Sequence, residues 1–282
     1  MMKGIRVWVV GVIFCIALLG CTKKDKSPVK AEQASKNSQL EKTASQPEAA
    51  VATPEVPAEP YKVLPNVGAA GTVEGQIKFA GTAPTNKPIA IPQSFRDARP
   101  DDFAFCESKN VKQDKTQILA GGVANVVVEI KGVAAGKAHL PPTALSVEHC
   151  RLSPRISLLP IGSRLTVSNA DPFVFASSML GAGDKVVWAQ EIMPDTKLSS
   201  MDLKTPEKLV VSSAQRPWMK AFVRVVPHPY FAVSDLAGRF KIENIPVGKY
   251  AVTAWHEVFG LRDGSVEITE GGTAKLELIY VQ

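Results

Sequence analysis

Short runs of alternating or β-rich apolar residues follow one another along residues 72–280, and Gly, Pro, Asn and Asp separate them. Alternation with a period of two is typical of a strand that buries one face. No comparable stretch shows a long apolar period of three to four residues, which favours an all-β sandwich class. The strands are expected at Thr72–Phe79, Val123–Ile130, Arg164–Ser168, Lys185–Ile192, Lys208–Ser212, Ala221–Val226, Arg239–Ile242, Tyr250–Trp255, Ser265–Ile268 and Ala274–Tyr280.

These strands are too many for one small sheet. Pro227, His228 and Pro229 interrupt the pattern between two strand-like segments. Because proline cannot donate a ladder hydrogen bond, we expect a hinge between two sandwiches at this point. The expected division is one domain over residues 68–227 and a second over residues 228–282.

The first twenty residues have the layout of a secretory signal. Lys3 and Arg6 precede an uncharged apolar run, residues 7–19, which ends at Gly20 and Cys21. The run is too short to cross a hydrocarbon core of roughly 30 Å comfortably. Removal of residues 1–20 is therefore favoured over the alternative, an uncleaved membrane helix, and both leave the rest of the chain outside the cytoplasmic membrane.

Residues 18–21, Leu-Leu-Gly-Cys, resemble the lipobox of bacterial lipoproteins. The resemblance implies that Cys21 receives a diacylglycerol, becomes the first residue and takes a further acyl chain such as palmitate. Thr22, where Asp would signal retention, resembles the default for sorting to the outer membrane. Because each buried CH₂ contributes about 0.8 kcal/mol, more than one chain anchors stably. We expect an outer-membrane lipoprotein whose membrane partner is reached through its lipid anchor.

Composition limits the remaining possibilities. Residues 21–67 are mostly polar or small, with no aromatic side chain before Tyr61, which predicts a flexible linker. Loss of Lys3 and Arg6 lowers the formal charge from +6 to +4. A charge this small and this scattered argues against nucleic-acid binding.

Cysteine usage predicts one disulfide. Cys15 leaves with the signal and Cys21 is acylated, so Cys106 and Cys150 remain in the folded part. Two thiols in an oxidising compartment are expected to pair. No C-x-x-C spacing for metal or redox chemistry is present.

Residues 232–252 have a distinct motif, S-D-x-x-G-x-F-x-I followed by P-x-G-x-Y. It resembles the signature of carboxypeptidase regulatory-like, transthyretin-type domains, although Ser234 stands where Thr is usual. Gly238 and Pro246 are expected in turns, while Phe240 and Tyr250 are expected in the core. The resemblance implies a small accessory β-sandwich with a carbohydrate-binding-like architecture.

The preceding segment, about residues 118–226, resembles the plastocyanin-like (cupredoxin) proteins related to methylamine utilisation. The resemblance rests on Asn169-Ala170-Asp171-Pro172 and on residues 213–221, S-A-Q-R-P-W-M-K-A. In that family a cupredoxin domain precedes the regulatory-like domain. The family's copper pattern, N-x-D-P-x-x-H and C-x-x-H-P-W-M, falls here on Phe175, Ser213, Arg216 and Met219.

Three of these four ligand positions have lost their ligand. A type-1 copper site needs two imidazoles and a thiolate, with a thioether as a weak axial contact. Ser213 is a poor soft-metal ligand, and Arg216 carries a fixed positive charge where the cation would bind. Phe175 and Trp218 are expected to fill the space with apolar rings. The sequence therefore predicts a degenerate copper site, with no metal or other cofactor.

The histidines of the mature chain are His139, His149, His228 and His256, and structural or surface roles are expected for them. A possible secondary site is His228 with His256 and Glu257, if the fold brings them together. Strand alternation sends His256 and Glu257 to opposite faces. Since no nucleophile elbow, zinc-protease helix or phosphate loop is recognisable, catalysis is not expected.

Three functions remain open. The first is a non-catalytic envelope protein that binds a protein or carbohydrate partner or has a structural role. The second is copper binding or electron transfer at an atypical site. The third is an enzyme that uses His256 and Glu257.

Overall fold

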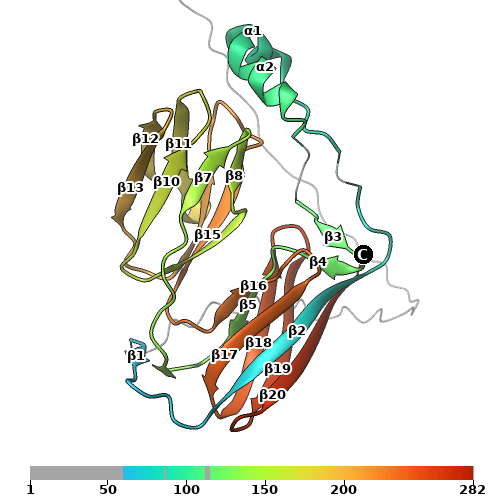
Figure 1. Ribbon diagram of the computed structural model, residues 1–282, viewed down its shortest axis with the longest axis vertical. Helices are drawn as coiled ribbons and strands as arrows, with labels where there is room; N and C mark the ends of the chain where they lie inside the picture. Colours follow the sequence, from blue (N-terminus) through green and yellow to red (C-terminus); the bar gives the residue numbers. More distant parts are fainter. Residues whose placement is uncertain (1–59, 86, 112–114, 282) are drawn as a thin grey trace, which may run out of the picture. The chain divides into compact units, whose positions relative to one another are not determined.

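The computed structural model describes residues 60–85, 87–111 and 115–281, and all of them belong to one compact unit. Within these ranges the chain forms twenty β-strands, two short α-helices and one 3-10 turn. The all-β prediction is therefore confirmed (Figure 1). The expected signal peptide (1–20), Cys21 and residues 22–59 of the expected linker lie outside the described residues.

None of the helices in the described part of the chain combines the length and the apolar character that crossing a membrane requires.

The first β-sandwich is formed by residues 145–226. Its strands are β7 (Leu145–Glu148), β8 (Arg151–Ser153), β9 (Ile156–Pro160), β10 (Arg164–Asn169), β11 (Phe175–Leu180), β12 (Val186–Ile192), β13 (Thr196–Asp202), β14 (Glu207–Ser212) and β15 (Lys220–Val226). One sheet has the order β13-β10-β7-β8 and the other the order β12-β11-β14-β15-β9. Alternate residues of both sheets, among them Leu145, Leu165 and Val223, share one buried core.

The second β-sandwich takes strands from both ends of the described chain. They are β2 (Ala70–Ala80), β3 (Ile118–Leu119), β4 (Gly122–Val123), β5 (Val127–Ile130), β16 (Phe231–Val233), β17 (Arg239–Pro246), β18 (Gly248–His256), β19 (Gly260–Ile268) and β20 (Thr273–Val281). One sheet has the order β16-β5-β18-β19, and the other has the order β17-β2-β4-β3 with β20 also paired to β2. Val73, Val128 and Tyr280 are fully buried in their common core.

The strand pairing differs from the predicted division into residues 68–227 and 228–282. That division assigns β2 and β5 to the first domain, whereas β2 pairs with β17 and β20, and β5 pairs with β16 and β18. The physical reason is the matching of buried faces, because Val73 and Val128 complete the core of the C-terminal strands. Pro227, His228 and Pro229 do connect the two sandwiches, and His228 is only 3% exposed.

The last residues of the expected linker are also part of the fold. β1 (Lys62–Val63) pairs in parallel with β6 (Ala135–Gly136). The hydroxyl of Tyr61 donates a 2.7 Å hydrogen bond to the carbonyl oxygen of Lys137, and its ring packs against the second core. The folded part therefore includes residues 60–67, because this first aromatic side chain finds an apolar surface to bury against.

The motif at residues 234–250 forms the expected turn at Gly238, whereas Pro246 is the last residue of β17 and pairs with Ala70. Asp235 Oδ1 accepts the backbone N–H of Arg239 at 2.8 Å, and Gly238 has φ +75°. Ser234 Oγ accepts the N–H of Val126 at 2.9 Å and thereby ties this turn to the start of β5. Phe240 is 6% exposed and lies in the second core.

Two helices that the strand pattern did not predict lie between β2 and β3. They are α1 (Gln93–Ala98) and α2 (Pro100–Ser108), with Pro100 in the first turn of α2. The Cys106–Cys150 disulfide joins α2 to the turn between β7 and β8, which confirms the predicted pairing. These helices are therefore covalently attached to the first sandwich.

Candidate functional site

The four predicted copper-ligand positions gather at one end of the first sandwich. Phe175 begins β11, while Ser213, Arg216 and Met219 lie on the loop that connects β14 to β15. β11 and β14 are hydrogen-bonded neighbours, so this loop passes beside the segment that enters β11. Phe175 and Arg216 are 0% exposed, and Ser213 and Met219 are 1% exposed. The sequence prediction thus identified residues that the fold does bring to one place.

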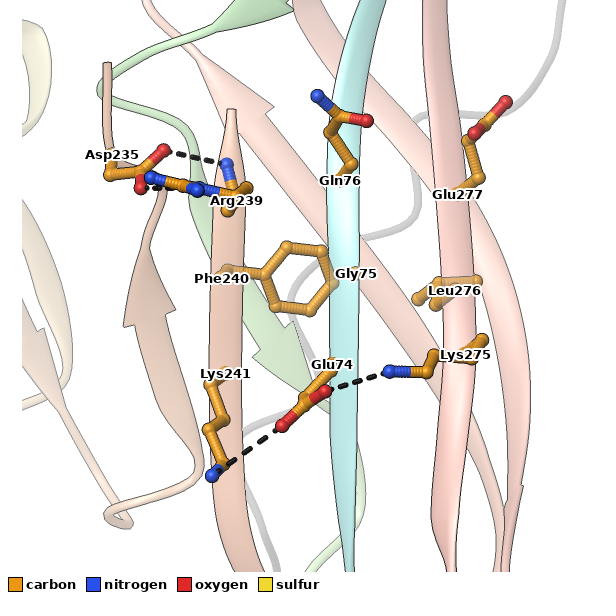
Figure 2. A pocket seen from close by; sticks show the side chains of 10 residues that line it. All are labelled: Glu74, Gly75, Gln76, Asp235, Arg239, Phe240, Lys241, Lys275, Leu276 and Glu277. Carbon is orange, nitrogen blue, oxygen red and sulfur yellow. Dashed lines mark hydrogen bonds and ion pairs between the residues drawn. The ribbon is translucent and has the colours of Figure 1, made fainter. Parts of the chain in front are cut away.

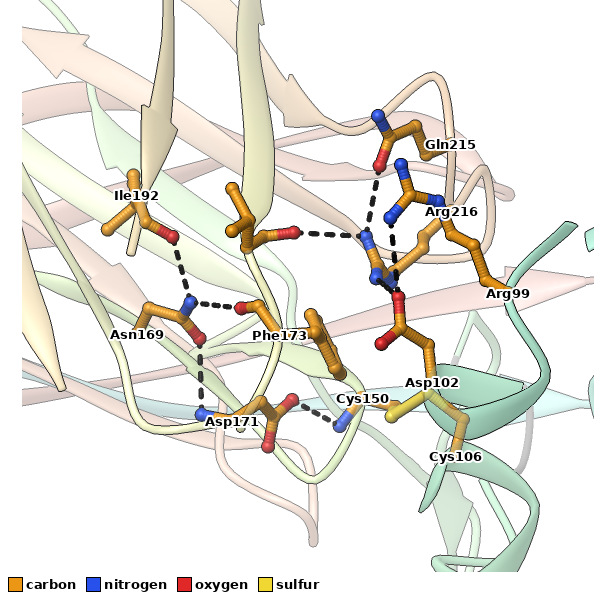
Figure 3. A network of polar contacts seen from close by, with 11 residues as sticks. Arg99, Asp102, Cys106, Cys150, Asn169, Asp171, Phe173, Ile192, Gln215 and Arg216 are labelled. Carbon is orange, nitrogen blue, oxygen red and sulfur yellow. Dashed lines mark hydrogen bonds and ion pairs between the residues drawn. A yellow bond between two sulfur atoms is a disulfide. The ribbon is translucent and has the colours of Figure 1, made fainter. Parts of the chain in front are cut away.

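In the Asn169-Ala170-Asp171-Pro172 motif, the polar side chains form hydrogen bonds with backbone groups of neighbouring segments (Figure 3). The Asn169 amide donates hydrogen bonds to the carbonyl oxygens of Phe173 and Ile192, at 2.7 Å and 2.9 Å. The Asp171 carboxylate accepts the backbone N–H groups of His149 and Cys150, at 2.7 Å and 2.8 Å. Both buried polar side chains are therefore used to fix loop positions.

Arg216 closes this end of the sandwich with a buried ion pair. Its guanidinium lies 3.9 Å from the centre of the Phe173 ring and 2.5 Å from the Asp102 carboxylate of α2 (Figure 3). It also donates to the carbonyl oxygen of Val174 at 3.3 Å. Burial lowers the pKa of Arg216, and the charge of Asp102 opposes that shift. A guanidinium keeps its charge in proteins, so this position holds a permanent cation whose counter-ion is internal.

The α1–α2 pair covers the same end. Phe95 of α1 meets the Trp218 ring edge-on, with 5.2 Å between the ring centres. Phe105 of α2 contacts Phe173 in the same manner at 6.1 Å. The Cys106–Cys150 disulfide and the Asp102–Arg216 ion pair add a covalent and an electrostatic connection. The loop between β14 and β15 is thereby packed beneath two helices.

The residues present do not fit a type-1 copper centre. Phe175 contributes an apolar ring, and Met219 packs in the hydrophobic core. Ser213 Oγ is buried with no hydrogen-bond partner among the described residues. A copper ion here would face the charge of Arg216 with a single thioether ligand, which is the weak axial contact of such sites. Within the described residues, no group of three or more His, Cys, Asp or Glu side chains could hold a metal ion.

The three residues of the expected secondary site, His228, His256 and Glu257, have different neighbours and do not form one group. His256 Nδ1 accepts the backbone N–H groups of Val258 and Phe259, at 3.1 Å and 3.3 Å, and its ring stacks on Phe259. Glu257 points the other way and forms an ion pair with Arg155. β18 ends at His256, and Glu257 is the first residue of the turn that follows.

His228 belongs to a separate aromatic group. Its ring lies 5.0 Å from Phe231 and 6.1 Å from Tyr61, and its Nδ1 accepts the N–H of Tyr230 at 3.3 Å. Burial is the main reason that the pKa values of His228 and His256 fall to about 4. Both imidazoles are therefore neutral at pH 7, and their described contacts are structural.

A hollow of about 660 Å³ lies over the outer face of β17, β2 and β20 (Figure 2). Glu74 lies between Lys241 and Lys275, at 3.4 Å and 2.7 Å, and Lys275 is the main cause of its lowered pKa. Asp235 pairs with Arg239 at 2.9 Å. These charges neutralise one another, as on a solvated sheet face, so this hollow does not define a charged ligand site.

Sequence reasoning missed Asp102 and Phe95, because they lie far from the copper-type motifs in the sequence. One local signal was available. Pro100 followed by Asp101 and Asp102 is typical of a helix N-terminus, where proline fits and acidic side chains are favoured. That signal locates a helix but does not reveal that its second aspartate pairs with Arg216.

No protein-family model and no curated protein matches the chain. Solved structures that share part of the fold include a purple cupredoxin from Nitrosopumilus maritimus, with 14% identity and a TM-score of 0.27 over 30% of this chain and 99% of that one. A Cu-containing nitrite reductase from Thermus scotoductus has 16% identity and a TM-score of 0.27 over 35% of this chain and 25% of that one. A reduced tryptophan-to-tyrosine mutant of amicyanin has 10% identity and a TM-score of 0.28 over 35% of this chain and 98% of that one. Similarity at this level carries no functional conclusion for this chain.

Proposed function

We propose that this chain is a non-catalytic, lipid-anchored protein of the bacterial cell envelope that binds a partner or has a structural role, and that its cupredoxin-type site is degenerate. The observation that supports this proposal most directly is the Arg216 guanidinium. It lies where the family pattern has a histidine ligand, and it is fully buried and paired with Asp102. The charge that would repel a metal ion is built into the packing of the domain.

Two further observations support the proposal. The Cys106–Cys150 disulfide fits an oxidising, extracytoplasmic compartment. Ser234, Asp235 and Gly238 form the turn that a regulatory-like accessory domain would use. A fold does not identify a ligand, so the partner class, a protein or a carbohydrate of the envelope, remains part of the proposal.

The copper part of the proposal is tested by reconstitution. The purified full-length chain is incubated with Cu(II), and in a second sample with Cu(I) under reducing conditions, then dialysed and analysed for bound metal and visible absorption. We expect no stoichiometric copper and no colour. The triple variant Phe175→His, Ser213→Cys, Arg216→His provides a positive control, because together with Met219 it restores the four ligand types. A coloured one-to-one complex of the unmodified chain would establish the competing function, electron transfer or copper handling.

The anchoring part is tested by fractionation of cells that produce the chain. The unmodified chain is expected in the outer-membrane fraction, and a Cys21→Ser variant is expected to lose stable membrane attachment, because it cannot be acylated. Equal distribution of the two forms between fractions would contradict the lipid anchor.

A further inference from the structure

A second hollow, of about 260 Å³, lies beside the covered loop end and is distinct from the degenerate copper positions. Its walls come from the segment before α1, the segment before β3, the residue that precedes β9, and the loop that enters β15. The lining residues are Ile89, Ala90, Pro92, Lys115, Arg155, Pro217, Trp218 and Lys220. This hollow is smaller than the one over the β17-β2-β20 sheet face, but its lining includes basic residues and no acidic one.

Three of the eight lining residues, Lys115, Arg155 and Lys220, are cationic, and none of the lining residues is acidic. A smaller adjoining hollow shares Arg155 and Lys220 and adds Arg151. No described carboxylate lies within ion-pair distance of Lys115 or Lys220, and both side chains are exposed. Like charges that converge on a partly enclosed space raise the local concentration of anions.

Arg155 has a defined position in this wall. Its Nε is paired with Glu257, and its Nη1 lies 3.5 Å from the carbonyl oxygen of Lys220. The Arg155 side chain is only 7% exposed. Arg155 therefore fixes the shape of this wall while its charge is paired with Glu257, and the two exposed lysines can move toward a ligand.

Trp218 provides the apolar part of the hollow. Its ring is held edge-on by Phe95, and Pro92 and Pro217 lie beside it in the lining. The indole Nε1–H is buried and has no hydrogen-bond partner among the described residues. A buried donor without a partner costs about 1–3 kcal/mol.

From this combination we infer that the hollow binds a small organic anion, a phosphate, sulfate or carboxylate attached to an apolar body. The anionic group contacts Lys115 and Lys220, and the apolar body packs on Trp218 and the neighbouring prolines. Sites for small molecules are commonly concave and apolar, with a few placed polar groups. The inference depends on the residues of this hollow and holds wherever in the cell the protein resides.

The test uses phenyl phosphate as the probe and the indole N–H signal of Trp218 as the reporter. The probe is titrated into the full-length chain labelled with nitrogen-15, and the Trp218 signal is assigned with a Trp218→Phe variant. We expect a saturable shift of this signal, while the indole signals of Trp188 and Trp255 stay unchanged. Inorganic phosphate, which lacks the apolar body, and phenol, which lacks the charge, should each bind at least about tenfold more weakly.

The lysine variants decide the question. Lys220→Gln and Lys115→Gln are each expected to weaken phenyl phosphate binding about tenfold, because one close charge is lost. Lys197→Gln, an exposed lysine of β13, is the matched control and should bind as the unmodified chain does. Absence of a saturable shift up to about 10 mM, or equal affinity in all three variants, would overturn the inference.

Discussion

His256 is one of the two residues that the sequence suggested for a possible enzyme, and the structure shows it buried in the core. It is 1% exposed, its ring stacks on Phe259 at 4.6 Å, and its Nδ1 accepts two backbone N–H groups of the following turn. The imidazole must be neutral to accept these bonds. A buried neutral histidine makes folding stability depend on pH.

The pH dependence follows from the lowered pKa values of His228 and His256. Both are about 4 in the folded protein, against about 6.5 when unfolded, so the unfolded state binds more protons between these values. Stability is therefore complete above pH 6.5 and is lost as the pH falls toward 4. We expect the free energy of unfolding, measured with urea, to be about 2–4 kcal/mol lower at pH 5 than at pH 7.5.

A His256→Asn variant is the control for this prediction. Its amide oxygen can still accept a backbone N–H, but it does not titrate, so the loss between pH 7.5 and pH 5 should be about half as large. An undiminished loss in the variant would show that other groups cause the pH dependence.

At the scale of residues, motif reasoning was successful where the chemistry is local. The motif spacing singled out Phe175, Ser213 and Arg216, and those side chains do lie at one end of the sandwich. The partner of Arg216 could not be predicted, because Asp102 is separated from it by 114 residues and no local pattern pairs them.

At the scale of elements, the two helices are the main feature that periodicity did not reveal. α1 has six residues and α2 has nine, and together they bury few side chains, among them Phe95, Phe103 and Cys106. Helices this short are marginal alone and depend on tertiary contacts. A pattern search over longer windows therefore has too little signal to detect them.

The disulfide is expected to be a main stabiliser of this helical cover. It closes a loop of 44 residues, and a loop of that length corresponds to about 4 kcal/mol in the chain-entropy model. The double variant Cys106→Ser, Cys150→Ser should lose about 2–4 kcal/mol of unfolding free energy in urea, with faster amide hydrogen exchange in α2. A reducing agent should weaken the unmodified chain by a similar amount and leave the double variant unaffected. Equal stability of the two chains would rule out this role.

Strand prediction worked where an apolar alternation is buried on one face, as in β10, β14 and β17. It missed the short strands β7, β8, β9 and β16, which have three to five residues each, and also β11 and β13. β11 contains two serines, and β13 is almost entirely exposed. Such strands are defined by backbone pairing with their neighbours, which propensity alone does not report.

At the scale of the whole molecule, the two sandwiches are interleaved in sequence. The chain leaves the second sandwich after β5, forms the first sandwich, and returns at β16, which pairs directly with β5 through Phe231 and Glu129. The sequence pattern located the return point at residues 227–229. It could not show that β2 and β5 pair with strands that follow it, since alternation identifies a buried face but not the face that covers it.

The two sandwiches also share a packed contact. Arg155 and Glu257 form an ion pair with side-chain exposures of 7% and 10%, and Phe222 meets Trp255 with 5.7 Å between the ring centres. Ile156 and Val226 of one sandwich pack with Val127 and Phe231 of the other. Removing one partner of a buried ion pair strongly destabilises the fold, because the other charge stays buried without compensation.

Glu257→Gln is therefore expected to lower the free energy of unfolding by about 3 kcal/mol, because a buried guanidinium loses its counter-charge. Differential scanning calorimetry should show one transition for the unmodified chain and a broadened or divided one for the variant. Glu267→Gln, which removes an exposed pair with Lys249, is the matched control and should cost less than about 0.5 kcal/mol. Equal effects of the two substitutions would mean that the contact does not couple the sandwiches.

Interleaving has a consequence for how the protein is made. β2 pairs with β20 along nine residue positions, and Glu74 and Lys275 in this pairing are 201 residues apart. A chain that emerges from its N-terminus can complete the first sandwich while β2 still awaits β17 and β20, and β5 still awaits β16 and β18. During that interval their open backbone edges can pair with another chain, so production of this protein should be sensitive to the supply of holding chaperones.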